Sequence, residues 1–308
     1  MINKIVAIQG NHPSKLNPIT DTSIFLAHEI QFKKYKIFYY DPKDLSIINR
    51  KVIAKGFFIK FNYGQKKFYK ILSRQRLDLS KCKFILIRQD PPFNLEYIST
   101  TYILDTIKDK VKIINNPTSI RNISEKLYSA KYQKFMPSTI FTQNIDEIKK
   151  FFKIHKKVIL KPIHSYSGND IHLLDKFNLI LIQKFIKKHD HIMCQKYLPK
   201  ICNGDKRVFL INGKLCGAIS RVPKKGSFLS NMSKGAKPIK IELTKVEKKI
   251  SKLVAKDLKK ENIYFAGIDF IDQKLNGDIN VTSPTGLKTL FDLSRINLAK
   301  TFWKGLKA

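Results

Sequence analysis

The sequence has few cysteines and no long hydrophobic run, and each absence excludes a class of protein. Its four cysteines, Cys82, Cys194, Cys202 and Cys216, are widely spaced and form no Cys-x-x-Cys pair. This pattern argues against a disulfide framework or a zinc site and favours reduced thiols that fill the core. No apolar run approaches the ~18 residues that a membrane helix needs, so we expect no membrane-spanning helix and no membrane partner. Residues 1–9 carry no basic leader or cleavage site, so we expect a cytoplasmic location.

Acidic residues are scarce as well, since 24 Asp and Glu stand against 59 Lys and Arg, for a formal net charge of +35. Such a charge can indicate a nucleic-acid partner, because lysine and arginine neutralise phosphates. Here the excess is lysine scattered through every expected element, and no segment is a purely basic arm. A bias in residue usage explains this pattern as well as a binding face does, so nucleic-acid binding is the less favoured interpretation.

Arginine is rare beside lysine, and its positions are therefore informative. A guanidinium group binds carboxylate or phosphate through two parallel hydrogen bonds, which an ammonium group cannot imitate. We regard Arg88, Arg207 and Arg221 as the first candidates for binding a charged ligand. Arginine occurs only at Arg50, Arg74, Arg76, Arg88, Arg121, Arg207, Arg221 and Arg295.

Short apolar segments alternate with helical ones over the first 120 residues, which predicts an α/β fold with a mostly parallel, doubly wound sheet. The segment at 51–69 alternates aromatic residues with lysine and is expected to be a hairpin excursion. Ligands of such sheets bind beyond the carboxyl ends of the strands, where the loop at 10–20 and the segment at 88–93 fall. The expected strands are 4–9, 36–40, 84–87 and 111–114, and the expected helices are 21–31 and 95–107.

The pattern changes near residue 120, where we place a domain boundary. Asn-Gly pairs at 212–213 and 276–277 lie between apolar runs and are the strongest short hairpin signals, so the C-terminal half is expected to be antiparallel. A helix at 287–306 is expected to close the chain. The other expected elements are helices at 119–133 and 146–154 and strands near 138 and at 158–161.

Hard oxygen ligands lie beside a turn of small residues at 269–286. Asp278 and Asn280 are two residues apart, so on a strand both side chains leave the same face. Carboxylate and amide oxygens are ligands that Mg²⁺ takes while it also holds nucleotide phosphates. The segment therefore indicates phosphate chemistry, although a polar strand end that runs into a turn has the same composition.

A lysine at a strand end is followed by a small polar loop. Lys161 follows Val158-Ile159-Leu160 and precedes a loop in which only Gly168 is glycine. Backbone N–H groups and a lysine charge suit nucleotide phosphates, so the loop is a candidate phosphate lid, with an ordinary surface loop as the alternative. The backbone at 195–199 could bind an adenine edge, and 203–207 gathers Asp, Lys and Arg, which a solvated charge cluster would also explain.

These segments, in this order, resemble the bacterial glutathione synthetases of the ATP-grasp superfamily, and the resemblance covers nearly the whole chain. Its most family-specific segments are Asn280 to Gly286 and Asp90-Pro91-Pro92-Phe93. The segments that carry the resemblance are Asp21-Thr22-Ser23, Arg88 to Phe93, Ser124 to Leu127, Ile159 to Pro162, Gln195 to Pro199, Gly204 to Arg207, Arg221 to Pro223, Ser230-Asn231 and Asp278 to Gly286.

The resemblance implies a doubly wound, substrate-binding N-terminal domain (pre-ATP-grasp) at 1–120, followed by an α+β ATP-grasp fold of two subdomains. The central subdomain at 121–200 would form the ATP lid, and the C-terminal subdomain at 201–308 would carry the metal and catalytic residues. The implied reaction ligates glycine to γ-glutamylcysteine through an acyl phosphate and yields glutathione, ADP and phosphate. The implied cofactors are two Mg²⁺ ions, with Mn²⁺ as an alternative, and homo-oligomers are usual in the family.

The resemblance also assigns roles to single residues. It implies that Arg207 and Arg221 are catalytic and that the metal ligands are Asp269, Asp278 and Asn280. The residues expected to bind ATP are Lys126, Lys161, Ser167, Gly168, Gln195, Tyr197, Leu198 and Asp205. The residues expected to bind the other substrates are Asp21, Ser23, Arg88, Asn231, Ser283, Thr285 and Gly286, with Asn231 in a lid at 224–237.

The chain departs from the family pattern in three places. The loop at 164–169 is poorer in glycine, and the lid has Gly235-Ala236-Lys237 where the family commonly has paired glycines and arginine. Asp278 stands in place of a glutamate, after a hairpin that is one residue longer. The longer hairpin could bring the shorter carboxylate back into reach.

Hairpin geometry sharpens the prediction for the metal ligands. A turn centred on 276–277 would place Asp269 ~13 Å along the strand from Asn280, too far for a shared metal site. A turn centred on 273–274 places Asp269 opposite Asp278, and we predict this second register. In the other hairpin, a regular turn at 212–213 puts Arg207 and Arg221 on opposite faces, so joint substrate contact requires a bulge or an Arg221 beyond the paired region.

Two other functions fit the same sequence. An ATP-grasp ligase that joins a different acid and amine would share the fold and the ATP chemistry, because substrate choice lies in loops. A basic nucleic-acid-binding protein without catalysis is the alternative from another class.

Overall fold

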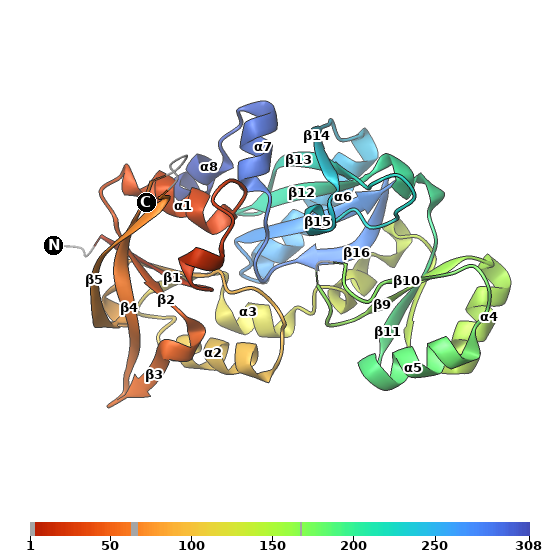
Figure 1. Cartoon of the computed structure of the whole chain (residues 1–308), viewed down its shortest axis with the longest axis horizontal. Coiled ribbons are helices and arrows are strands. Elements are labelled where there is room, and N and C mark those ends of the chain that lie inside the picture. The colour runs from red at the N-terminus through yellow and green to blue at the C-terminus, as the bar shows by residue number, and fades with distance from the viewer. Residues whose placement is uncertain (1–3, 63–66, 167) are drawn as a thin grey trace.

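Three β-sheets form the framework of the protein, with the N-terminal sheet on the left of Figure 1, the C-terminal sheet in the centre and the central sheet on the right. The computed structural model describes residues 4–62, 67–166 and 168–308. The N-terminal sheet contains β1 (Ile5–Gln9), β2 (Lys36–Tyr40), β3 (Leu45–Ile48), β4 (Lys51–Phe61), β5 (Tyr69–Asp78), β6 (Phe84–Ile87) and β7 (Lys112–Ile114). Its order is β3-β4-β2-β1-β6-β7, and β5 pairs with β4.

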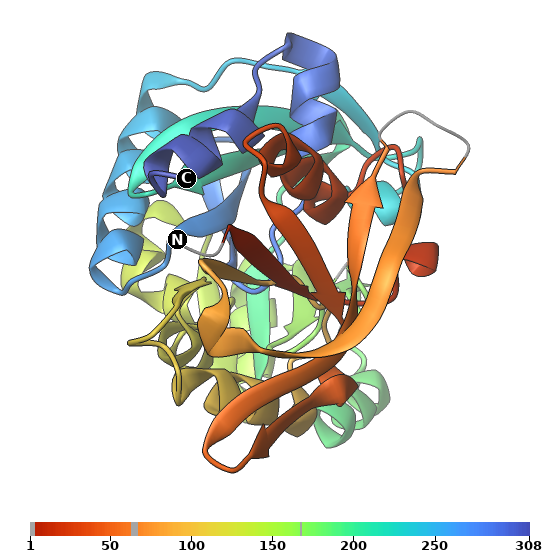
Figure 2. The ribbon, with the colours of Figure 1, turned by 90° about the vertical axis from the view of Figure 1, so that its left-hand side faces the viewer.

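The N-terminal sheet is parallel at its centre, as the alternation of strands and helices predicts. β1 pairs in parallel with β2 and β6, and β6 pairs in parallel with β7. α1 (Thr22–Gln31) belongs to the cluster on the face of Val6 and Ile8, whereas α2 (Leu95–Asp105) belongs to the cluster on the face of Ala7. The sheet is therefore covered on both sides. The expected hairpin excursion is longer than predicted, and β4 and β5 form an antiparallel edge (Figure 2).

The central sheet is antiparallel and carries two helices. It contains β8 (Thr139–Thr142), β9 (Val158–Pro162), β10 (His172–Leu174) and β11 (Ile192–Lys196), in the order β10-β9-β11-β8. α4 (Ile145–His155) and α5 (Leu179–His189) share one hydrophobic cluster with this sheet. Asn144 and Asn178 cap the two helices by accepting from backbone N–H groups of the first turn.

The C-terminal sheet is antiparallel too, which confirms the prediction from the Asn-Gly pairs. It contains β12 (Asp205–Ile211), β13 (Lys214–Val222), β14 (Lys237–Lys240), β15 (Phe265–Ile271) and β16 (Lys274–Asn280), in the order β14-β13-β12-β15-β16. α6 (Lys245–Lys260) packs against one face of this sheet. α7 (Leu287–Ser294) and α8 (Leu298–Gly305) join the other face to α1, and Trp303 Nε1 donates to Leu26 O at 2.9 Å.

Three expectations from the sequence were wrong. The closing helix at 287–306 is two helices, because Arg295 adopts a left-handed conformation at the end of α7 and Asn297 caps α8. The helix expected at 119–133 is α3 (Pro117–Asn122) and a 3₁₀ segment at Leu127–Phe135, separated where Ile123 is extended. Cys202 is exposed rather than in the core.

In the described part of the chain, no helix is both long and apolar enough to cross a bilayer.

Asn115 joins the N-terminal sheet to the C-terminal sheet. Its buried amide follows β7, and Nδ2 donates to the backbone oxygens of Phe265 and Val281, both at 2.7 Å. Its Oδ1 accepts from the N–H groups of Tyr264 and Phe265 at 2.9 and 2.8 Å. One side chain thus satisfies backbone groups at the start of β15 and just after β16, and these groups would otherwise be buried without partners.

We predict that Asn115→Ala lowers the free energy of unfolding by about 3 to 5 kcal/mol, because several buried backbone groups lose their partner at once. Asn116→Ala is the matched control, since Asn116 only caps α3, and it should cost about 1 kcal/mol. Urea denaturation of both variants tests this difference. Equal losses for the two variants would contradict the role assigned to Asn115.

Candidate active site

The central and C-terminal sheets line a cavity that opens to solvent. The loop at 163–171 and the segment at 223–236 contribute to its lining. Most of the residues predicted to bind ATP and metal or to act in catalysis lie here, while Ser167 lies outside the described residues. The predicted residues that line the cavity are Lys126, Lys161, Gly168, Gln195, Tyr197, Leu198, Asp205, Arg207, Arg221, Asn231, Asp269, Asp278 and Asn280.

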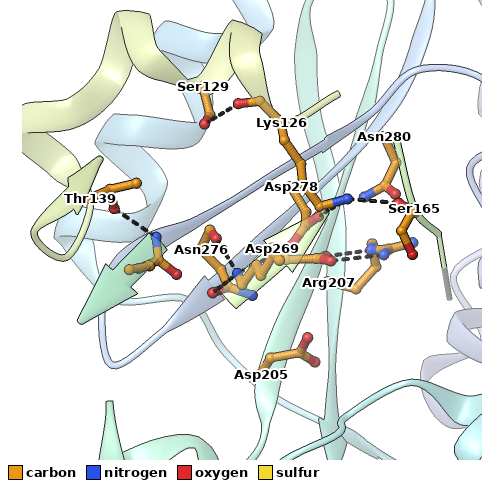
Figure 3. Close-up of polar contacts among 12 residues, drawn as sticks. Lys126, Ser129, Thr139, Ser165, Asp205, Arg207, Asp269, Asn276, Asp278 and Asn280 are labelled. Atoms are coloured by element: carbon orange, nitrogen blue, oxygen red, sulfur yellow. Dashed lines mark hydrogen bonds and ion pairs between the residues drawn. The ribbon is translucent and has the colours of Figure 1, made fainter. Parts of the chain in front are cut away.

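A chain of alternating charges lies in the wall formed by the C-terminal sheet, and Figure 3 shows three of its members, Asp205, Arg207 and Asp269. The two oxygens of Asp269 accept from Arg207 at 2.5 and 2.8 Å, and Oδ2 also accepts from Arg221 at 2.9 Å. Arg221 in turn donates to both oxygens of Asp205. All four side chains are buried, so each charge depends on its neighbours. Burial alone would raise the pKa of the Asp269 carboxyl, but the two guanidinium groups lower that pKa to about 2.

A β-bulge explains how two arginines of one hairpin reach the same carboxylate. The turn lies at Asn212-Gly213, as predicted, and a regular ladder from it would put Arg207 and Arg221 on opposite faces. The pairing of β12 with β13 shifts by one residue at Cys216, so that Asp205 lies opposite Arg221. Of the two arrangements that would allow joint contact, a bulge or an Arg221 beyond the paired region, the structure has the bulge.

The hairpin of β15 and β16 has the predicted register beside Asp269 but not the predicted turn. Its turn lies at 272–273, where both residues have positive φ, one position before the expected one. Further along, Ile268 pairs with Ile279, which is the register that places Asp269 near Asp278. Between the turn and this pair, one residue of β15, Asp269, faces three residues of β16, 276–278. The Asn-Gly pair therefore lies in a bulge of β16 and not in the turn.

Two buried lysines flank Asp278. Lys126 Nζ lies 3.6 Å from Asp278 Oδ1 and donates to Ser165 O at 2.7 Å. Lys161 Nζ lies 3.7 Å from Asp278 Oδ2 and donates to Asn276. Burial lowers the pKa of Lys161, whereas Asp278 acts to raise it. Two ammonium groups on one side of a cavity are a candidate site for phosphate oxygens.

The wall formed by β9 and β11 is suited to a purine ring. Ile159 and Leu198 line it, and Ile271 lines the cavity from β15. Gln195 Nε2 donates to Thr139 Oγ1 at 2.9 Å, which fixes the amide at the edge of this apolar surface. Apolar side chains with a few oriented polar groups are what ligand pockets for flat rings commonly present.

Two segments from different subdomains meet over the cavity. Gly168, between β9 and β10, has a φ of +71°, and a Cβ built on it would lie 2.4 Å from Asn231 Oδ1. Asn231 belongs to the segment between β13 and β14, of which Phe228 and Leu229 also line the cavity. Glycine is therefore required at 168 both for its backbone angle and for this close approach.

A second group of polar residues lies at the carboxyl ends of β1 and β6. Arg88 is buried, its Nε donates to Ser23 Oγ at 3.0 Å, and its Nη1 has no hydrogen-bond partner among the described residues. Asp21, which caps α1, and Asp90 favour its charged form, while burial lowers the pKa of Arg88. A buried cation with an unused donor is a candidate for binding a ligand carboxylate.

The segment after β16 fixes other predicted substrate residues against this group. Ser283 Oγ donates to Gln89 O at 2.9 Å, and Gly286 N donates to Thr22 Oγ1 at 3.1 Å. Thr285 is exposed. The segment after β16 therefore contacts both the start of α1 and the segment after β6, the two places where the other predicted substrate residues lie.

Sequence reasoning missed several residues that line the cavity, among them Glu125 and Asn276. Glu125 Oε1 accepts from the N–H groups of Val281 and Thr282 at 3.0 and 3.2 Å, which fixes the chain just after β16. Its place beside Lys126 in a family-specific segment was a signal for it. Asn276 gave no such signal, because an Asn-Gly pair predicts a turn.

The chain also matches known protein families along nearly its whole length. The family model of the prokaryotic glutathione synthetase N-terminal domain matches residues 5–121, and that of the prokaryotic glutathione synthetase ATP-grasp domain matches residues 125–295. The chain belongs to the prokaryotic glutathione synthetase family. Relatives named glutathione synthetase include one from Agrobacterium fabrum, 32% identical over 99% of this chain and 96% of that protein, and one from Mesorhizobium japonicum, 34% identical over 98% and 97%.

Solved structures confirm that this glutathione synthetase family member has the ATP-grasp fold. The ATP-grasp ligase PsnB in complex with a minimal precursor aligns with a TM-score of 0.67 at 12% identity, over 100% of this chain and 99% of that chain. D-alanyl-alanine synthetase A from Vibrio cholerae aligns with a TM-score of 0.64 at 14% identity, over 100% and 98%. The predicted fold class, a doubly wound domain followed by a two-subdomain ATP-grasp fold, is confirmed.

We predict that Asp269→Ala lowers the free energy of unfolding by about 3 to 5 kcal/mol, because it leaves Arg207 and Arg221 buried without their shared partner. Asp278→Ala is the matched control. The Asp278 side chain is 25% exposed and meets its lysines only beyond 3.5 Å, so its loss should cost about 1 kcal/mol. Thermal and urea denaturation of both variants, without ligand, checks the contrast. An Asp269→Ala protein as stable as the control would refute the structural role of the network.

Proposed function

We propose that this protein is a glutathione synthase, which joins glycine to γ-glutamylcysteine with cleavage of ATP to ADP and phosphate. Family membership and similarity over nearly the full length of proteins named glutathione synthetase support the proposal. The observation that carries it is the convergence, in one cavity, of Asp269, Asp278 and Asn280 with the buried Lys126 and Lys161. Oxygen ligands and ammonium groups there face an apolar wall, which together complement a metal-bound nucleotide.

The residues present fit Mg²⁺. Asp269 and Asp278 supply carboxylates, and Asn280 uses its Nδ2 to donate to Gly267 O at 3.3 Å, which leaves the amide oxygen for a ligand. The described residues contain no cluster of three His, Cys, Asp or Glu that could hold a metal by themselves. This suits Mg²⁺, which is commonly held by one or two carboxylates together with phosphates and water. When bound, the ions would neutralise charge on the phosphate oxygens. Two Mg²⁺ ions, with Mn²⁺ as an alternative, are part of the proposal.

Groups of the chain account for both chemical steps. The cysteinyl carboxylate of γ-glutamylcysteine attacks the γ-phosphorus of ATP and ADP leaves, so an acyl phosphate forms. The glycine amine then attacks the acyl carbon, the carbon–oxygen bond to phosphate breaks, and the leaving phosphate takes the proton that the nitrogen loses. Lys126 and Lys161 would hold phosphates, and Arg207 would stabilise the transferring oxygens through the donors that Asp269 does not occupy. Closure of the segment around Asn231 would keep water from the acyl phosphate.

The contacts favour different roles for the two predicted catalytic arginines. Arg221 uses Nε and Nη2 on Asp205 and Asp269, so its main role would be to hold these carboxylates. Arg207 has only Asp269 as an acidic partner among the described residues. Arg207 is therefore the better candidate for contact with the reacting phosphate, and Asp205 would reach ATP only through lone pairs not taken by Arg221.

The group around Arg88 fits the zwitterionic end of γ-glutamylcysteine. We assign the α-carboxylate of the glutamyl residue to Arg88, whose Nη1 is buried and has no partner among the described residues. The α-ammonium group would meet Asp21 or Asp90, the acidic groups that act on Arg88. Ser23, Asn231, Ser283, Thr285 and Gly286 complete the proposed substrate set, and a cytoplasmic location and homo-oligomeric state stay predictions.

The first test measures ADP release by the purified protein with ATP, Mg²⁺, γ-glutamylcysteine and glycine, omitting each component in turn, with the tripeptide identified by mass. We expect release to require every component and to be abolished by Asp278→Ala, because that variant loses a proposed metal ligand. Parallel reactions with other acids and amines separate the proposal from a ligase of different specificity. ADP release with another pair but no glutathione would overturn the substrate assignment and leave the ligase class intact.

A second test concerns Arg88. We predict that Arg88→Met lowers kcat/KM for γ-glutamylcysteine about 100-fold, because a desolvated guanidinium–carboxylate contact is lost. With 4-aminobutyryl-cysteine, which lacks the α-carboxylate, the same substitution should change kcat/KM less than about 3-fold. Arg121→Met is the matched control, since Arg121 pairs with Asp105 away from the site. Equal losses with both substrates would refute the assignment of Arg88 to the α-carboxylate.

A further inference from the structure

Lys161 is held at the cavity wall by Asn276, a residue to which no role has been assigned. Its Nζ donates to the backbone oxygen and to the side-chain Oδ1 of Asn276, both at 2.9 Å (Figure 3). The side chain of Lys161 is only 5% exposed, and Asp278 lies beyond hydrogen-bond distance at 3.7 Å. Asn276 therefore supplies both hydrogen bonds that the structure gives this ammonium group in the described part of the chain.

The bulge of β16 at residues 276–278 places Asn276 at this position. Asn276, Asp278 and Asn280 alternate along the strand and all line the cavity, because the two-residue shift of the pairing keeps the same face inward. Gly277 permits the bulge, since its φ is +88° and a Cβ there would lie 2.7 Å from Met193 Cε. The bulge is thus packed from behind, and it directs a backbone oxygen and an amide oxygen at one lysine.

We propose that Asn276 is a positioning residue, which holds the Lys161 ammonium group against β16 so that its remaining N–H is directed at a nucleotide phosphate. An ammonium group has three donors, and Asn276 takes two of them. A flexible four-carbon stem would otherwise have to be ordered by the nucleotide itself, at a cost in affinity. The inference rests on the proposed function, because it presumes that Lys161 binds phosphate.

The neighbouring lysine shows that such fixation is a shared feature of the site. Lys126 Nζ donates to the backbone oxygen of Ser165. Each lysine is therefore tied by a carbonyl of a different segment, Lys126 by the loop after β9 and Lys161 by the bulge of β16. Of the two, Lys161 alone has a side-chain hydrogen-bond acceptor among the described residues, so this contact can be removed by a substitution without a change in the backbone.

The experiment is a double-mutant cycle that measures the Kd of ADP by calorimetry, with and without Mg²⁺. We expect Asn276→Ala to weaken ADP binding about 10-fold in the otherwise unchanged chain, and less than about 2-fold in a chain that also carries Lys161→Met. The KM for ATP should rise by a similar factor while kcat changes less than about 3-fold. The factor should be the same without Mg²⁺, because the contact involves no metal ligand.

Controls keep the outcomes distinct. Gln273→Ala changes the turn of the same hairpin outside the cavity and should leave the Kd of ADP unchanged. If the alanine variant does not fold, Asn276→Thr, which introduces a residue suited to a strand, takes its place. An Asn276→Ala effect on the Kd that is equally large with and without Lys161→Met would overturn the inference alone. Normal ADP binding by the Lys161→Met variant would overturn the phosphate role of Lys161 and the inference together.

Discussion

The rest of the site depends on the buried carboxylate of Asp269, which two guanidinium groups share. A carboxylate in this position is stable only because Arg207 and Arg221 both reach it, and they do so only because β13 departs from regular pairing at Cys216. On the other side of β15, the ladder to β16 departs from regular pairing as well. Asp269 therefore lies between two irregular hairpins, β12–β13 and β15–β16. Regular pairing in either hairpin would separate the residues that line the cavity.

How far the sequence predicts this architecture depends on the range of the interactions involved. The parallel sheet was predicted correctly, because its central strands are buried on both faces and appear as continuous apolar segments. The closing helix was predicted wrongly, because an apolar pattern continues past Arg295, where a single left-handed residue ends α7. A periodic pattern reports which face is buried, and it does not report a local change of direction.

The candidate site divides in the same way. The family resemblance named many of the residues that line the cavity. Hairpin geometry alone gave a bulge near Arg221 as one of two possibilities and predicted the register beside Asp269; both are present, although the turn of the second hairpin lies one position earlier than predicted. Asn276 was concealed because its Asn-Gly pair is a strong local turn signal, whereas the structure has this pair in the bulge of β16. Composition alone does not distinguish Lys126 and Lys161 from the many other lysines; the strand-end position of Lys161 and the family resemblance single them out, and both are buried.

The four hydrogen bonds of Asn115 bear on how the cavity is supported. Its amide pairs with backbone groups at the ends of β15 and β16 much as a further strand residue would, so the N-terminal and C-terminal sheets are joined into one body. The wall made of β9 and β11 is tied to that body by Lys161 of β9, whose Nζ donates twice to Asn276 of β16. Because Asn115 joins two sheets, the side of the cavity formed by the C-terminal sheet is backed by the N-terminal sheet as well, and the two act as one support for the charged residues.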